Sequence, residues 1–162
     1  MSGRVEAIHV VEEHSGAPRA RESVRAVPGR GLEGDRHFGS GAHDLTMVEA
    51  EALEGLASEV GTELGPGESR RQVTTRGIAL NELVGKRFLV GAIECEGEEL
   101  CEPCRHLESL TKPGVVRGLA HRGGLCARVL GEGEIAVGDA VKPAPSSSGG
   151  ALQERETRDR PG

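Results

Sequence analysis

The sequence predicts a mainly β domain with many turns and few helices, and two observations support this fold class. First, the 162 residues include 25 glycines, which destabilise the interior of a helix but suit turns that need a positive φ. Second, the chain ends in a meander of short apolar runs, Leu125 to Leu130, Ile135 to Val137 and Ala140 to Val141, separated by glycine turns. Such an ending is typical of small barrels. With two Phe and neither Trp nor Tyr, the core must be built from Val, Leu, Ile and Ala.

Two strands are predicted near the N-terminus. Arg4 to Val11 is rich in Val and Ile and ends at a polar loop, and Glu22 to Val27 forms a second short run. The segment from Pro28 to His37 follows, with Gly31 and Gly34 and a charged tip. It lacks the spacing and the strand-to-helix setting of a phosphate-binding glycine loop, so we do not expect it to bind a nucleotide.

The clearest helix is predicted at Glu49 to Val60, where apolar residues recur at helical spacing and Gly61 can close the end. Thr46 and Glu49 have the spacing of a capping box for this helix. After a loop with Gly-Pro-Gly at its centre, Arg70 to Thr75 is predicted as a strand because Val73 is flanked by Thr residues.

Further short elements are predicted in the second half. Ile78 to Val84 should form a turn of helix, and Arg87 to Cys95 a strand that Gly91 kinks. His106 to Leu110 and Gly114 to Ala120 resemble short helical pieces, split at Pro113 because proline disfavours helical geometry for the residue before it. Residues 1–142 are interpreted as one domain. Residues 143–162 have almost nothing apolar, so we expect a flexible tail.

The charge pattern limits the classes of partner. A net charge of −6 argues against general binding to nucleic acid or to acidic membranes, although Arg outnumbers Lys by 17 to 3 and local anion sites remain open. The chain has neither a signal-peptide pattern nor a long apolar run, so we expect a cytoplasmic protein. In that compartment the four Cys should stay reduced.

Cys101 and Cys104 stand three positions apart around Pro103, with Arg105 and His106 following. Cationic neighbours favour the thiolate, which is both a nucleophile and a ligand for soft metals. The partner could be a second sulfur, a zinc ion, or a soft transition metal carried by a molecule in a basic pocket. Zinc normally needs four ligands, and the other two thiols, Cys95 and Cys126, form no second pair of this spacing. We expect both of those to be buried apolar residues on strands.

A second candidate site lies in the strand predicted around Arg70. Alternation along a strand would place Arg70, Gln72, Thr74 and Arg76 on one face. Two guanidinium groups with an amide between them would form an anion cradle suited to phosphate. The alternative is a solvated strand edge with surface ion pairs. His37, His43 and His121 are further candidates, although their spacing is equally that of ordinary loop histidines.

Several stretches, taken in order, resemble the MOSC domain, a family named for the C-terminal domain of molybdenum cofactor sulfurases that also includes small stand-alone bacterial proteins. The similarity runs from about residue 4 to residue 142. The stretches that carry it are Gly31 to His37, Arg70 to Asn81, Val84 to Phe88, Cys101 to Cys104, His121 to Val129 and Ile135 to Asp139.

This resemblance implies a closed, mainly antiparallel β-barrel of the pyruvate-kinase type with a few short helices, which binds the molybdenum cofactor through its pterin phosphate. The family's metal-ligating cysteine corresponds to Cys104. Its Arg-x-Asn element corresponds to Arg70 and Gln72, where Gln is a departure that lengthens the amide's reach by one methylene. The residues implied or predicted to bind the cofactor are Arg70, Arg71, Gln72, Arg76 and His37.

The implied activity is reduction of small N-hydroxylated compounds at a molybdenum centre ligated by Cys104, fed by an electron-donor protein. The alternative is a carrier or insertion module that holds the cofactor, or sulfur, on Cys104 without turnover. A structural zinc domain is a lesser alternative. The sulfurases also contain a pyridoxal-phosphate domain, for which this chain has no room, so we expect no pyridoxal phosphate.

Overall fold

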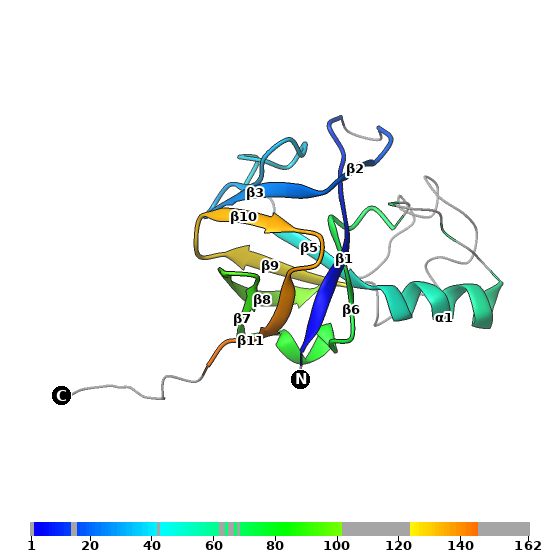
Figure 1. Ribbon diagram of the computed structural model, residues 1–162. Helices are drawn as coiled ribbons and strands as arrows, with labels where there is room; N and C mark the ends of the chain where they lie inside the picture. The colour runs from blue at the N-terminus through cyan, green and yellow to red at the C-terminus, as the bar shows by residue number, and fades with distance from the viewer. Residues whose placement is uncertain are drawn as a thin grey trace.

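Seven strands form a closed barrel in the computed structural model, which describes residues 2–13, 16–41, 43–61, 64, 67, 69–101 and 124–145 (Figure 1). Neighbouring strands follow the order β11-β7-β8-β9-β5-β6-β1, and β1 pairs with β11 to close the ring. The predicted fold class, a mainly β barrel, is confirmed. The barrel strands are β1 (Gly3–Val10), β5 (Leu45–Glu49), β6 (Val73–Arg76), β7 (Arg87–Val90), β8 (Ile93–Leu100), β9 (Leu125–Val129) and β11 (Ala140–Pro143).

One pair of barrel strands is parallel, within the mainly antiparallel arrangement that the resemblance implied. β5 and β6 run in the same direction, with Met47 opposite Val73, and the other barrel pairs are antiparallel. A parallel pair needs a long crossover connection. Helix α1 (Ala50–Val60) lies in that connection, to one side of the barrel (Figure 1).

Helix α1 begins one residue later than predicted and ends where predicted. Its N-cap, Glu49, makes no side-chain capping bond, and Thr46 lies within β5, so the predicted capping box is wrong. Gly61 closes the helix in the left-handed conformation (φ 77°), with its N–H donated to the Ala57 carbonyl at 3.1 Å. One face of the helix buries Ala52 and Leu56.

The smaller elements lie against the barrel. Strand β2 (Arg19–Arg21) pairs with β1, and a second sheet joins β10 (Gly133–Ala136), β3 (Ser23–Val27) and β4 (Gly31–Leu32). The predicted helical turn near residue 80 is the 3-10 helix η1 (Leu80–Leu83). Within the described ranges, no helix is long and apolar enough to cross a membrane.

The predicted strand from Arg87 to Cys95 is in fact two strands. Gly91, at φ 61°, lies in the turn of a hairpin between β7 and β8 instead of kinking one strand. Gly97 lies within β8, where a Cβ atom would come within 2.1 Å of the Leu83 carbonyl oxygen, so η1 can pack directly on this strand only because residue 97 is glycine.

The barrel interior is almost entirely aliphatic, as the composition predicted. Phe88 is its largest residue, and free Cys95 is fully buried beside it in the β7–β8 pairing. The buried residues of this main core are Val5, Ile8, Val10, Val24, Ala26, Leu32, Leu45, Met47, Val73, Ile78, Leu80, Leu83, Phe88, Val90, Ile93, Cys95, Leu125, Ala127, Val129, Ile135 and Val141.

Two predictions concern residues outside the described ranges. The short helical pieces predicted at His106 to Leu110 and Gly114 to Ala120 lie wholly in the stretch 102–123. Most of the expected tail lies in the stretch 146–162, although β11 continues through Pro143, and the Ala144 N–H bonds to the Arg87 carbonyl at 3.0 Å.

Candidate functional site

The loop after β4 is organised around one buried carboxylate, Asp35. It is 7% exposed, and its Oδ1 accepts the Val11 N–H at 2.9 Å. Its Oδ2 accepts the His37 N–H at 3.1 Å. A buried carboxylate is stable only when such donors surround it. Asp35 therefore fixes the loop that carries Arg36 and His37 against the end of β1.

Gln72 connects this loop to the barrel. Its Nε2 donates to Asp35 Oδ2 at 2.9 Å, and its Oε1 accepts the Thr46 N–H at 2.9 Å. The Gln72 N–H in turn donates to Thr46 Oγ1 at 3.0 Å. The amide of Gln72 is thus used inside the protein. We call these three residues the Asp35–Gln72–Thr46 network.

Arg70 has an unusual environment. It is the one non-glycine residue with a positive φ (63°) in the part of the chain that the structure describes. Its Nη1 donates to the Gly16 carbonyl at 2.6 Å, whereas Nε and Nη2 are buried and find no hydrogen-bond partner among the described residues. Burial lowers the pKa of Arg70, and the nearby charge of Arg36 lowers it further, while Asp35 opposes the shift.

The shared strand face predicted for Arg70, Gln72, Thr74 and Arg76 is wrong, because β6 begins only at Val73. Arg76 lies at the other end of β6, where it forms ion pairs with Glu6 and Glu54. The hydrogen bonds that Arg76 donates to these two carboxylates raise the pKa of Arg76. Arg70 and Arg76 therefore share none of these charged neighbours, and the two-arginine cradle does not form.

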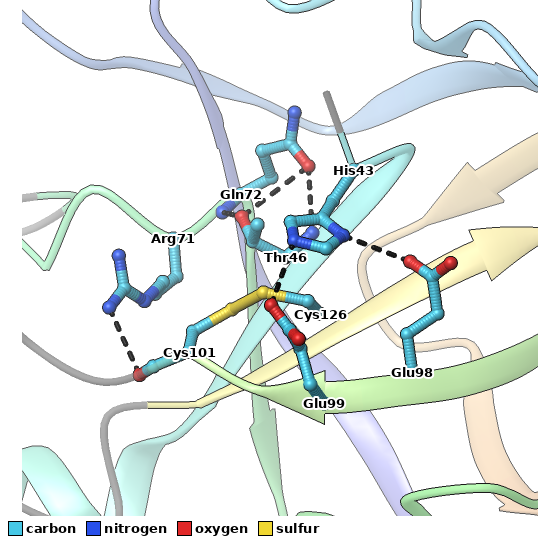
Figure 2. Close-up of a disulfide and its surroundings, with 8 residues drawn as sticks. All are labelled: His43, Thr46, Arg71, Gln72, Glu98, Glu99, Cys101 and Cys126. Atoms are coloured by element: carbon cyan, nitrogen blue, oxygen red, sulfur yellow. Dashed lines mark hydrogen bonds and ion pairs between the residues drawn. A yellow bond between two sulfur atoms is a disulfide. The ribbon is translucent and has the colours of Figure 1, made fainter. Parts of the chain in front are cut away.

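Cys101 and Cys126 form a disulfide, with their Cα atoms 5.6 Å apart (Figure 2). The expectation that all four cysteines stay reduced is therefore wrong for these two. The β-sheet pairing explains the bond: Leu100 is opposite Leu125, and each cysteine directly follows one of these two residues. In an antiparallel register this makes Cys101 and Cys126 diagonal neighbours, close enough for a disulfide. Arg71 Nη2 donates to the Cys101 carbonyl at 3.2 Å beside the bond. Cys104, with His106 and His121, lies outside the described residues.

His43 lies beside the disulfide, between two carboxylates (Figure 2). Its Nδ1 is 2.9 Å from Glu98 Oε1, and its Nε2 is 3.3 Å from Glu99 Oε2. Arg128 Nε approaches Glu98 from the other side at 3.9 Å. A hollow of about 610 Å³ opens here, lined by Gly29, Gly41, His43, Asp44, Glu98 and Arg128.

Sequence reasoning found Arg70, Arg71 and Gln72 but missed the residues that hold them. Asp35 lies in the Gly31 to His37 stretch that carries part of the resemblance, but nothing in its spacing indicates that it would be buried and bonded to Gln72. Thr46 was interpreted as a helix cap. The disulfide gave no spacing signal, since its cysteines are 25 residues apart; only a correct alignment of β8 with β9 could have suggested it.

The family model described as "MOSC domain" matches residues 33–142. No curated protein sequence matches the chain at a significant level. Among solved structures, the YuaD protein from Bacillus subtilis is similar with a TM-score of 0.76 and 18% identity, covering 87% of this chain and 94% of that one. YiiM from Geobacillus stearothermophilus is similar with a TM-score of 0.68 and 17% identity, covering 91% of this chain and 77% of that one. YiiM from Escherichia coli is similar with a TM-score of 0.64 and 14% identity, covering 88% of this chain and 70% of that one. At these identities the structures support the fold alone.

Proposed function

The chain belongs to the MOSC domain family, which is associated with the molybdenum cofactor, and from this premise we propose that it binds that cofactor with Arg70 as the main ligand of the pterin phosphate. The observation that carries the proposal is the pair of buried Arg70 nitrogens that have no hydrogen-bond partner among the described residues.

Nε and Nη2 lie on the same side of a guanidinium group, so together they form the edge that binds two oxygens of one phosphate or carboxylate. A buried cation without an anion is costly, and the lowered pKa of Arg70 reflects that cost. Its backbone is also held in the left-handed region, which costs a non-glycine residue about 1–2 kcal/mol. A phosphate bound at this edge would supply the missing partner.

The other predicted ligands differ in how well they fit. Arg36 lies close enough to Arg70 to lower its pKa, and the two charges together favour a dianion. His37 follows Arg36 on the loop that Asp35 holds, and Arg71 is adjacent to Arg70. Gln72 supports the site instead of contacting the phosphate, because its amide is bonded to Asp35 and Thr46. Arg76 is paired with two carboxylates, so we do not propose it as a ligand of the cofactor.

Cys104 is the proposed ligand of the metal. When bound, the molybdenum centre would supply oxygen-atom chemistry, for which a soft thiolate is a suitable ligand. The role of the chain is to hold the cofactor by its phosphate and to present Cys104. We propose reduction of small N-hydroxylated compounds as the reaction. Cys101 is bonded to Cys126 in this structure, which disfavours a zinc site built from Cys101 and Cys104 together.

The test of cofactor binding compares Arg70→Ala with Arg30→Ala, after expression in a cofactor-producing host. Arg30 lies over the Phe38 ring at 5.1 Å and is exposed, so its loss removes the same charge without touching the site. We expect Arg70→Ala to lose most of the bound molybdenum and pterin, and Arg30→Ala to retain them. Equal losses of cofactor from the two variants would mean that only the total positive charge matters and that the position of Arg70 does not.

A second test separates an enzyme from a carrier. Loaded protein is assayed with an electron donor and an N-hydroxylated compound, and Cys104→Ser should abolish the activity without unfolding the domain, whereas Cys101→Ser should retain most of it. A carrier would show no catalytic reduction but would transfer the cofactor to a recipient enzyme. Release of zinc with unfolding in both variants would favour the structural zinc alternative.

A further inference from the structure

We propose that reduction of the Cys101–Cys126 disulfide opens a zinc site formed by the two released thiolates together with His43 and Glu99. This inference does not depend on the molybdenum cofactor, because these four residues are separate from those proposed to bind it.

The ligand atoms are already close together. A ring nitrogen of His43, a carboxylate oxygen of Glu99 and Cys126 Sγ all lie within 4.8 Å of one another. Cys101 Sγ is bonded to Cys126 Sγ and is therefore adjacent. In tetrahedral zinc sites the ligand atoms are about 3.3–3.8 Å apart, which small side-chain rotations would reach from this arrangement.

The barrel strands determine this grouping. In the antiparallel pairing of β8 with β9, Glu99 is directly opposite Cys126, and Cys126 is also opposite Thr46 of β5. His43 lies just before β5, the strand that pairs with the other edge of β9. Two neighbouring strands therefore hold Glu99 and Cys126, while Cys101 directly follows β8. Donors held on strands or at their ends are positioned better than donors on a single loop.

Glu98 provides a second, independent observation. Histidines that bind metals usually donate their other ring N–H to a carboxylate, which fixes the tautomer and orients the ring. Glu98 Oε1 is 2.9 Å from His43 Nδ1, and Arg128 lies beside Glu98. With the proton on Nδ1, the lone pair of Nε2 faces Glu99, the side on which Cys126 lies (Figure 2).

The burial pattern suits an ion that enters from solvent. The His43 side chain is 40% exposed and that of Glu99 66% exposed. Cys101 and Cys126 are only 7% and 5% exposed, so the sulfurs form the base of the site. The hollow lined by His43 and Glu98 adjoins the site at the histidine.

The redox step balances with a dithiol donor, such as a thioredoxin-type protein. Two electrons break the Sγ–Sγ bond, two protons give two thiols, and the donor is oxidised to its own disulfide. Zinc then binds the thiolates and releases both protons to solvent. The disulfide form of such a donor can accept two electrons from the zinc-bound thiolates, which joins the sulfurs again, returns the donor to its dithiol form and expels the ion. The disulfide and the metal are therefore mutually exclusive states.

The test uses the full chain from a host that makes no pterin cofactor, in oxidised form and after reduction with a phosphine. Zn²⁺ is titrated against a chromophoric chelator, and Co²⁺ serves as a spectroscopic substitute. We expect the reduced protein to bind one equivalent, with a thiolate-to-cobalt absorption band, and the oxidised protein to bind at least about 100-fold more weakly because two ligands are missing. Equal binding by both forms, or none by the reduced form, would overturn the proposal without affecting the Arg70 experiment.

Variants identify the ligands. His43→Ala and Cys126→Ser should each weaken zinc binding by about 100-fold, and Glu98→Gln by about 10-fold through the histidine. Glu134→Gln, an exposed glutamate on β10, is the matched control and should bind as the wild type does. If Cys104→Ser loses zinc while His43→Ala retains it, the ligands are those of the Cys101 to His106 stretch, and the proposed site is wrong. Circular dichroism confirms that each variant is folded.

Discussion

The barrel interior and the Asp35–Gln72–Thr46 network are both buried, but their side chains are held in different ways. The interior is aliphatic around Phe88, and its stability comes from apolar area removed from water. The network is polar, and each of its hydrogen bonds offsets the desolvation of a buried group. Arg70 lies beside this network with two nitrogens unpartnered among the described residues. The difference teaches that apolar burial here stabilises the interior, whereas the buried polar network fixes the backbone beside Arg70, where we propose that a phosphate binds.

The largest expected effect is in the interior. Phe88→Ala should lower the free energy of unfolding by about 3–5 kcal/mol, because it removes the largest fully buried side chain and leaves a cavity. Urea denaturation measures this change. Provided that the variant is still folded, inorganic phosphate should stabilise it as much as it stabilises the wild type, as measured by thermal shift. If phosphate no longer stabilised the variant, the interior and the Arg70 site would not be separable.

Asp35→Ala should have the next largest effect. It leaves Val11 N–H, His37 N–H and Gln72 Nε2 without an acceptor, at a cost of about 3 kcal/mol in unfolding free energy. The matched control is Glu132→Ala, an exposed acid paired with Arg25, which should cost less than about 1 kcal/mol. Similar costs for both variants in urea would contradict the structural role of the network.

The buried thiol of Cys95 should make the protein less stable at alkaline pH. Burial raises the pKa of its thiol from 9.0 to about 12. The folded state thus favours the neutral thiol, so this contribution is complete below pH 9 and is lost as the pH rises from about 9 to about 12. At pH 10 the loss should be on the order of 1 kcal/mol. Cys95→Ala should remove this part of the pH dependence in urea titrations, and an unchanged pH dependence would refute it.

The smallest expected effect compares Arg70, which lies before β6, with Arg76, the last residue of that strand. Inorganic phosphate at half saturation should stabilise the cofactor-free protein by about 0.4 kcal/mol if it binds only the folded state. Arg70→Met should abolish this gain in a thermal-shift experiment. Arg76→Met should keep it, since Arg76 is already paired with Glu6 and Glu54. The comparison fails if both variants respond alike.

The sequence predicted local elements better than their pairing. The strands near Arg4 and Ser23, the helix closed by Gly61 and the aliphatic core follow from local periodicity and composition, and all were confirmed. The β5–β6 parallel pair and the hairpin turn at Gly91 depend on which strands meet, which local patterns do not encode.

The candidate site was predicted only in part, for a related reason. Strand alternation assumes a regular backbone, but Arg70 adopts a left-handed conformation and β6 starts three residues later, so the predicted common face does not exist. Asp35 reaches Gln72 across 37 positions of sequence and Cys101 reaches Cys126 across 25. Residues that act together through such distant pairing leave no spacing pattern that a single sequence could reveal.

The closure of the barrel by β1 and β11 has a consequence for folding on the ribosome. Gly3 pairs with Val141, and Arg4 with Ala140, so β1 leaves the exit tunnel long before its partner β11. Until then β1 can pair with β2 and β6 but keeps part of one edge open, and open edges can join other nascent chains. Contacts between such distant residues also slow folding, because a long loop must close first. Slowing translation before residue 140 should therefore prolong the interval in which the growing chain depends on chaperones.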